Sequence, residues 1–249
     1  MTLPYALEDY LPSTGDVGVI VADEIAALGG TLVDVVDDGG RLFVRALLAD
    51  TDDVTPGDTI HGGIAIRVQG PSVTVQAYTL RQVCSNGAMG ARPADAFRVE
   101  RAPAGTPIEL VTPVHDTIRD AVRRCAESPA FVEAIVRMRV ATQSEAPRAM
   151  YVLPQLLHAM SLHAPPEWHD RVLYEVMHRF AHGRDRSLFG LLNAVTSTAR
   201  DETDPARRWA LEELGGQLLV GAMVPRRVQA GRRPLDGTLT ARELVEAGA

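Results

Sequence analysis

The stretch VTVQAYTLRQVCSNGAMG, residues 73–90, decides the first part of the fold, because an alternating strand pattern runs directly into a polar turn. A period of two places Val73, Val75 and Ala77 on one face of a sheet and Thr74 and Gln76 on the other. A guanidinium, a thiol, an amide and a glycine then follow closely: Arg81, Cys84, Asn86 and Gly87. Asn-Gly is typical of a turn, since both residues tolerate left-handed backbone conformations.

The residues before this stretch predict a helix and two hairpins. Apolar residues recur at helical spacing over residues 16–28, and Gly29-Gly30 ends that helix. Strands at 31–36 and 41–49 flank Asp37-Asp38-Gly39-Gly40, whose glycines suit a hairpin turn. Strands at 59–69 and 72–84 are joined at Gly70-Pro71. The expected order is therefore helix, hairpin, hairpin.

The residues after position 111 predict helices instead. Thr112-Pro113, Ser128-Pro129 and Asp204-Pro205 each place a capping side chain before a proline at the first helical position. Amphipathic patterns continue near 149–162, 166–181, 187–199 and 205–221, and the short connection between the last two predicts a helical hairpin. We therefore expect a helical bundle.

The sequence thus predicts an α+β fold, in which an N-terminal helix with antiparallel β-hairpins, a β-β-β-α-like core, precedes a C-terminal helical bundle. The expected domains are an antiparallel-sheet domain at 1–110, a helical domain at 111–224 and a basic tail at 225–249. A chain of 249 residues that is 46% hydrophobic can bury a core of this size.

The RQVCSNG turn and a later segment, SLFGLLNAVTSTAR at 187–200, resemble the phage/plasmid-like family of uncharacterised proteins, domain of unknown function 932. In that family an RxVCxNG-like turn is followed, late in the chain, by a helix with an NAVT-like core. Asn193 and Thr196 lie in this otherwise apolar helix, where polar side chains need partners. We hypothesise that the two motifs meet across an interface between the two halves of the chain.

The helix–hairpin–hairpin order is also similar, at the level of fold, to single-strand annealing proteins of the Red beta, Erf and Sak type. That resemblance implies a homo-oligomer that binds single-stranded DNA in recombination or repair. The candidate phosphate contacts are arginines of the strand region: Arg41, Arg45, Arg67, Arg81, Arg92, Arg98 and Arg101.

Composition limits these functions. The net charge is -7 and all 25 basic residues are arginine, so any nucleic-acid site must be a local patch. The absence of lysine excludes Schiff bases and the phosphate-loop lysine. No apolar run is long enough for a membrane span and the N-terminal segment is acidic, so we expect a cytoplasmic protein without a membrane partner.

Other groups of residues that suggest catalysis or metal binding have weaker support. Cys84 beside Arg81 could be a nucleophile, with His61 as a base, but nothing in the sequence orients His61, and we expect unbridged thiols and no enzyme. A helical face carries Glu175, His178 and His182. Di-metal helical bundles need the Glu-x-x-His pattern twice and only one clear copy is present, and the His-Glu-x-x-His order of zinc proteases is absent, so neither a metal nor a cofactor is expected. The alternative function is a non-enzymatic interaction factor, anti-restriction or regulatory, which the acidic loop at 50–58 and the net charge favour.

Overall fold

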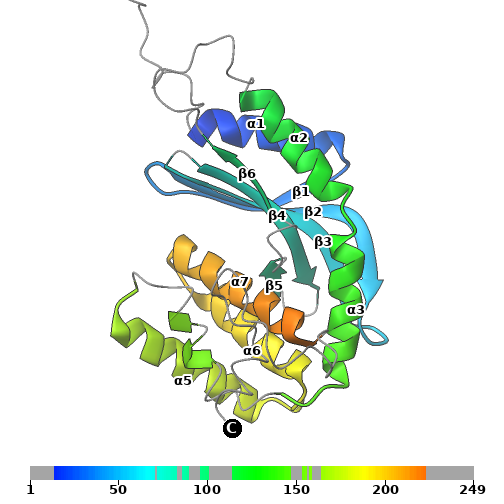
Figure 1. The fold of residues 1–249 in the computed structure, drawn as a ribbon, viewed down its shortest axis with the longest axis vertical. Coiled ribbons are helices and arrows are strands. Elements are labelled where there is room, and N and C mark those ends of the chain that lie inside the picture. The colour runs from blue at the N-terminus through cyan, green and yellow to red at the C-terminus, as the bar shows by residue number, and fades with distance from the viewer. Residues whose placement is uncertain are drawn as a thin grey trace, which may run out of the picture. The chain divides into compact units, whose positions relative to one another are not determined.

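The computed structural model describes residues 14–70, 72–82, 86–89, 96–100, 114–146, 153–155, 157–158 and 164–222. Figure 1 shows an N-terminal helix, an antiparallel sheet and C-terminal helices, which confirms the predicted α+β class. The expected tail at 225–249 lies outside the described residues. Within the described part of the chain, no helix combines the length and apolar character that a membrane crossing requires.

Within the described residues, the sheet has six strands: β1 (Thr31–Asp37), β2 (Arg41–Asp53), β3 (Thr59–Gln69), β4 (Ser72–Arg81), β5 (Asn86–Met89) and β6 (Ala96–Glu100). Its order is β1-β2-β3-β4-β5, and β6 pairs antiparallel with β4. The expected turn between β1 and β2 is present, because Gly39 and Gly40 have φ values of 56° and 107° that other residues rarely adopt. The two predicted hairpins are therefore confirmed.

Strands β5 and β6 were not predicted. Asn86-Gly87, expected to form a turn, instead begins β5, and this expectation is wrong. The local turn preference of Asn-Gly is outweighed by tertiary structure, because β5 lies in the sheet beside β4 and also contacts the helices α6 (Leu188–Asp201) and α7 (Pro205–Ala222).

The chain divides into two compact units that do not follow the expected boundary at residue 110. The first unit comprises Met1–Thr51, His61–Thr79 and Pro93–Phe131, and the second comprises Asp52–Ile60, Leu80–Arg92 and Val132–Ala249. The difference arises because β2, β3 and β4 each contribute residues to both units. Arg81 therefore belongs to the second unit.

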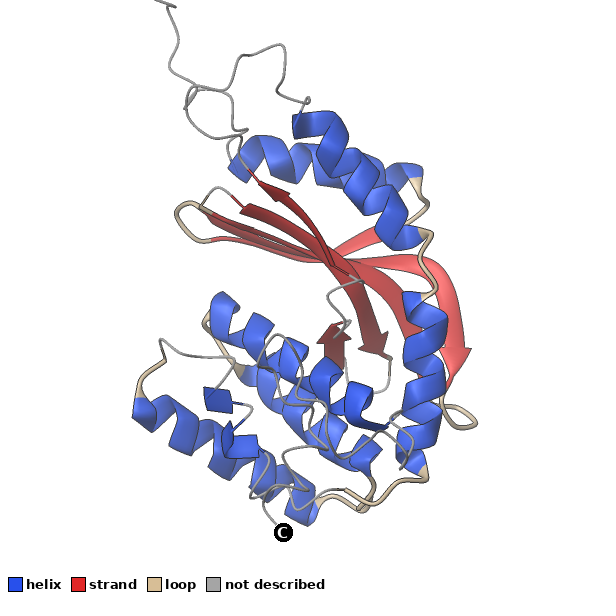
Figure 2. Ribbon diagram, in the orientation of Figure 1, coloured by secondary structure: helices blue, strands red, loops and turns tan. Residues whose placement is uncertain are grey.

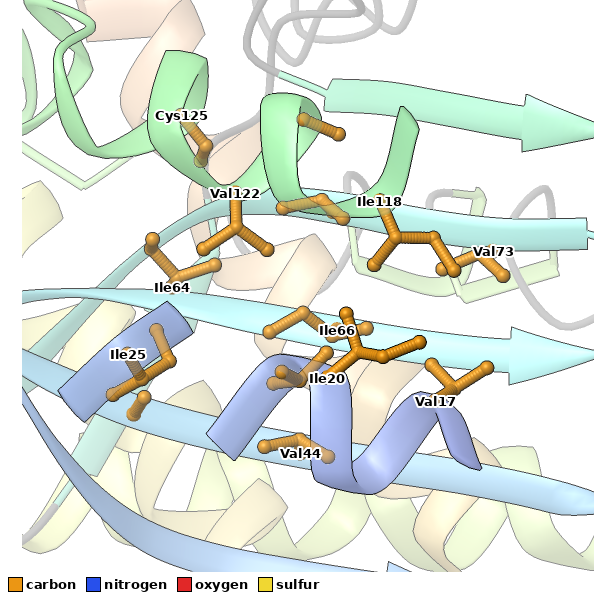
Figure 3. Packing of buried hydrophobic residues seen from close by; sticks show 14 of the residues in the cluster. Val17, Ile20, Ile25, Val44, Ile64, Ile66, Val73, Ile118, Val122 and Cys125 are labelled. Carbon is orange, nitrogen blue, oxygen red and sulfur yellow. The ribbon is translucent and has the colours of Figure 1, made fainter. Parts of the chain in front are cut away.

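The core of the first unit forms where α1 (Thr14–Ala27) and α2 (Val114–Ala126) cover one face of the sheet (Figure 3). The alternating pattern explains this packing, since every second residue of each central strand faces the helices. Apolar side chains from both helices and from β2, β3 and β4 are buried there, as in the cluster of Val21, Val44, Ile66, Val75 and Val122. Cys125 is buried in the same core and forms no disulfide with a described residue.

The second unit is mainly helical, as Figure 2 shows, with most of α3 (Ala130–Thr142), α5 (Pro166–His182), α6 and α7. The predicted helical hairpin is confirmed, because α6 and α7 pack together and bury the expected side chains: Leu188, Leu191, Leu192, Val195, Leu211, Leu214 and Leu218. The predicted cap is present as well. The Asp204 carboxylate accepts hydrogen bonds at 2.9 Å from the backbone N–H groups of Ala206 and Arg207.

Candidate functional site

The second unit contains a cavity of about 520 Å³ whose wall is rich in charge. That volume lies within the range of small-molecule sites. The wall combines three arginines, two aspartates, two phenylalanines and four neutral hydrogen-bonding side chains: Arg81, Arg179, Arg184, Asp58, Asp185, Phe180, Phe189, Thr55, Thr142, Asn193 and Ser197.

Arg81, at the end of β4, is held in place by two neighbours. Its Nε and Nη2 donate to the two carboxylate oxygens of Asp58, at 2.5 and 2.8 Å. Its Cζ lies 5.5 Å from the ring centroid of Phe189, within the range of a cation–π contact. Asp58 is positioned by the β2–β3 turn, where its N–H donates to the carbonyl of Thr55 and its carbonyl accepts from Val54 N–H. A bidentate pair of this kind fixes both the position and the orientation of the guanidinium.

Arg179, near the end of α5, is held by α6. Its Nη1 donates to Ser197 Oγ and its Nη2 donates to Asp201, both at 2.7 Å. Burial acts to raise the pKa of Asp201, but hydrogen bonds from Arg179 and Arg200 hold that pKa below its ordinary value. Asp201 therefore remains ionised at neutral pH and offsets the charge of Arg179.

Arg184 differs from both. It is exposed, and it forms no hydrogen bond or ion pair with any residue that the structure describes. Among the three arginines of the wall, it is therefore the one whose charge no described carboxylate offsets. Because guanidinium groups bind phosphate and carboxylate well, Arg184 is the first candidate contact for an anionic ligand.

One residue from each of the two sequence motifs lines this cavity. Arg81 from the first motif and Asn193 from the second both line it, and both belong to the second unit. The second motif's Thr196 has a different role, because its buried hydroxyl donates to the carbonyl of Leu192 at 3.0 Å and so is satisfied within α6. Gly87 lies in β5, whereas Cys84 and the side chain of Asn86 are outside the described residues.

The other predicted phosphate contacts are distributed differently. Arg45 is 1% exposed and its Nη1 donates to Asp34 at 2.9 Å, which argues against direct contact with a phosphate. Arg41 pairs with Asp38, Arg67 is half-buried and Arg98 is exposed on β6. Arg92 and Arg101 lie outside the described residues.

The histidine face on α5 is a local arrangement. The rings of His178 and His182 lie 4.1 Å apart between centroids, and Glu175 pairs with Arg171 at 3.6 Å. Within the described ranges, no group of three or more His, Cys, Asp or Glu residues is arranged to hold a metal ion.

Sequence reasoning missed Arg179, Phe180 and Arg184, which belong to the segment RFAHGRDRS at 179–187. The cluster of arginines around Gly183, where a helix ends, was a usable indication of an anion site. The pairing of Asp58 with Arg81 had no such indication, because it depends on how the β2–β3 turn meets the end of β4.

The arrangement can bind an anion together with a polar and partly apolar group, since the cavity offers charge, neutral hydrogen-bonding side chains and two aromatic rings. Comparisons with protein-family models, with curated proteins and with solved structures give no match for this chain.

Proposed function

We propose that the protein binds single-stranded nucleic acid, with DNA as the expected ligand, as a non-enzymatic cytoplasmic factor in recombination or repair. The proposed contacts are in the cavity of the second unit and not along the sheet. Binding by several copies of the chain acting together is part of the same proposal.

The observation that carries the proposal is a cavity wall that combines the exposed Arg184 with the half-buried Phe180, beside two further arginines and a second phenylalanine. Proteins that bind single strands use cationic groups for the backbone and aromatic rings for the bases. A local site of this kind is compatible with a net charge of -7, whereas a long basic groove is not indicated, because Arg41 and Arg45 are paired with carboxylates. The resemblance to single-strand annealing proteins supports the same ligand.

The test is fluorescence anisotropy with a labelled oligonucleotide, single-stranded or duplex, at low salt. We expect the single strand to bind more tightly than the duplex. Arg184→Gln should weaken binding about 10- to 100-fold, the equivalent of one charge-assisted contact worth roughly 1.5 to 3 kcal/mol.

Arg124→Gln is the matched control. Arg124 is likewise an exposed arginine without a hydrogen bond or ion pair to any described residue, but it lies on α2 in the first unit. The two variants change the net charge equally, so only a local effect separates them. If both variants weakened oligonucleotide binding equally, the loss would come from the change in net charge and not from a site at Arg184. If the natural chain bound no oligonucleotide at low salt, the proposed function would be refuted.

A second candidate is the non-enzymatic protein-interaction factor. It is favoured by a stripe on one face of α3, where Val132, Val136 and Val140 are 64%, 42% and 38% exposed. Apolar side chains grouped on an exposed helix face are typical of protein contacts. Absence of oligonucleotide binding would leave this candidate in first place.

A further inference from the structure

The loop between α5 and α6, residues 183–187, carries Arg184 and is fixed at both ends. Arg186 Nη1 and Nη2 donate to the carbonyls of Phe180 and Ala181, at 2.7 and 2.8 Å, so Arg186 satisfies the last turn of α5. On the other side, Ser187 caps α6 by accepting from Gly190 N–H at 3.2 Å. A loop anchored in this way holds its exposed side chains near one place before any ligand arrives.

Backbone hydrogen bonds with the residues that follow α3 also anchor this loop. Leu188 N–H donates to the carbonyl of Ser144 at 2.8 Å, and Ala146 N–H donates to the carbonyl of Arg186 at 3.3 Å. The Asp185 carboxylate accepts from Ser187 N–H at 2.8 Å, which directs it toward the backbone at the start of α6. Arg184 is therefore followed by two restrained residues, Asp185 and Arg186. Its own side chain forms no hydrogen bond or ion pair with a described residue.

The rest of the wall offers groups that suit more than a bare anion. Asn193 lines the cavity with a carboxamide that can both donate and accept, as the polar edge of a base can. Thr142 and Ser197 line it too, and the half-buried Phe180 adds apolar surface. Inorganic phosphate would use only the cationic part of this wall.

We propose that the cavity takes one nucleotide as a unit, with its phosphate on Arg184 and its base and sugar against Phe180 and Asn193. The choice of a nucleotide rests on the proposed function, which it makes more specific. A free nucleoside monophosphate then binds the cavity by itself and competes with an oligonucleotide for it. At about 520 Å³ the cavity falls within the size range of sites for ligands of this class.

The experiment is isothermal titration of the full chain with deoxythymidine monophosphate, with thymidine and inorganic phosphate as separate probes. We expect saturable binding of the monophosphate, and binding at least about tenfold weaker for each partial probe. Arg184→Gln should weaken the monophosphate at least about tenfold and leave thymidine unchanged, because the lost contact is to the phosphate. Arg184→Lys should recover part of the loss, since it restores charge without the planar fork.

Arg124→Gln should bind the monophosphate as the natural chain does. Inorganic phosphate as tight as the monophosphate would overturn the inference, because base and sugar would then contribute nothing. A single-stranded oligonucleotide that binds while no monophosphate does would overturn it and leave the proposed function standing. Binding of the monophosphate that depends on Arg184, without any oligonucleotide binding, would instead support the nucleotide site and refute the nucleic-acid function.

Discussion

Glu202 is a buried carboxylate at the end of α6 whose side chain accepts four hydrogen bonds. Its side chain accepts from Trp168 Nε1 at 2.6 Å, from Arg171 Nη2 at 2.8 Å, and from the N–H groups of Thr203 and Asp204 at 3.0 and 3.1 Å. We predict that Glu202→Gln lowers the free energy of unfolding by about 2 to 3 kcal/mol at neutral pH, because an amide cannot accept all four bonds. Urea denaturation measures this difference.

The same residue predicts a dependence on pH. Burial acts to raise the pKa of Glu202, but hydrogen bonds from Trp168, the Asp204 backbone and Arg171 hold it below its ordinary value of 4.5. A lowered folded pKa means that the carboxylate stabilises the fold fully above the unfolded pKa, and that this contribution is lost as pH falls through the folded pKa. The natural chain and Glu202→Gln should therefore converge in stability as the pH falls below the ordinary carboxyl pKa of 4.5.

The matched control is Asp170→Asn, which removes an exposed carboxylate from α5. It should change the free energy of unfolding by less than about 0.5 kcal/mol at neutral pH. A constant gap between the natural chain and Glu202→Gln from neutral to acid pH would show that protonation of Glu202 does not control the loss.

The α6–α7 hairpin depends on a close approach at Gly215. A Cβ at this position would lie 2.9 Å from Thr196 Cγ2 and 3.1 Å from Leu192 Cδ1, and both side chains are buried. We predict that Gly215→Ala destabilises the fold by about 1 to 3 kcal/mol through overpacking, although alanine favours a helix by about 1 kcal/mol. Thermal and urea denaturation of the purified variant test this.

Gly18→Ala on α1 is the contrasting substitution. Its Cβ would meet only Leu42 Cδ2, at an ordinary contact distance of 3.8 Å. Without a clash, the helix preference of alanine remains, and stability should be unchanged or rise by up to about 1 kcal/mol. If Gly215→Ala stabilised the protein as Gly18→Ala should, the two helices would not be in close contact at Gly215.

The sequence predicts helices and strands well where the spacing of apolar residues and the helix-capping residues agree. The Asp204-Pro205 start and the leucines near Leu192 are local features, and both were predicted correctly. Strand β5 has only the four residues NGAM, too few to show a period, and its pairing depends on neighbours distant in sequence. The cavity was missed for the same reason, since Asp58, Arg81 and Arg184 come together only in the folded chain.

The charge of the whole chain limits how it can bind nucleic acid. Acidic residues exceed basic ones by 32 to 25, and many arginines are committed to carboxylates, as in Arg123 with Glu24 and Arg139 with Asp52. The exposed pair of Arg139 with Asp52 adds little stability, yet both pairs reduce the local positive potential. The long-range electrostatic attraction between the protein and a nucleic acid is then weak, and the affinity for nucleic acid must come from a few close contacts.

This limit gives a prediction for salt dependence. Each phosphate neutralised on a single strand contributes about -0.7 to the slope of log affinity against log salt, so three cavity arginines allow a slope no steeper than about -2. Arg184→Gln should reduce its magnitude by about 0.7. Arg45→Met should leave the slope unchanged but lower the free energy of unfolding, because Arg45 is buried in its pair with Asp34.

Anisotropy titrations at several salt concentrations measure all three slopes, and a denaturation curve for each variant separates binding from folding. A slope near -5, or one that Arg45→Met reduces, would place the phosphate contacts outside the cavity and return them to the strand arginines. A slope no steeper than about -2, which Arg184→Gln reduces and Arg45→Met does not, is what a small site on an acidic protein requires, since its affinity then depends on the cavity and not on the charge of the chain.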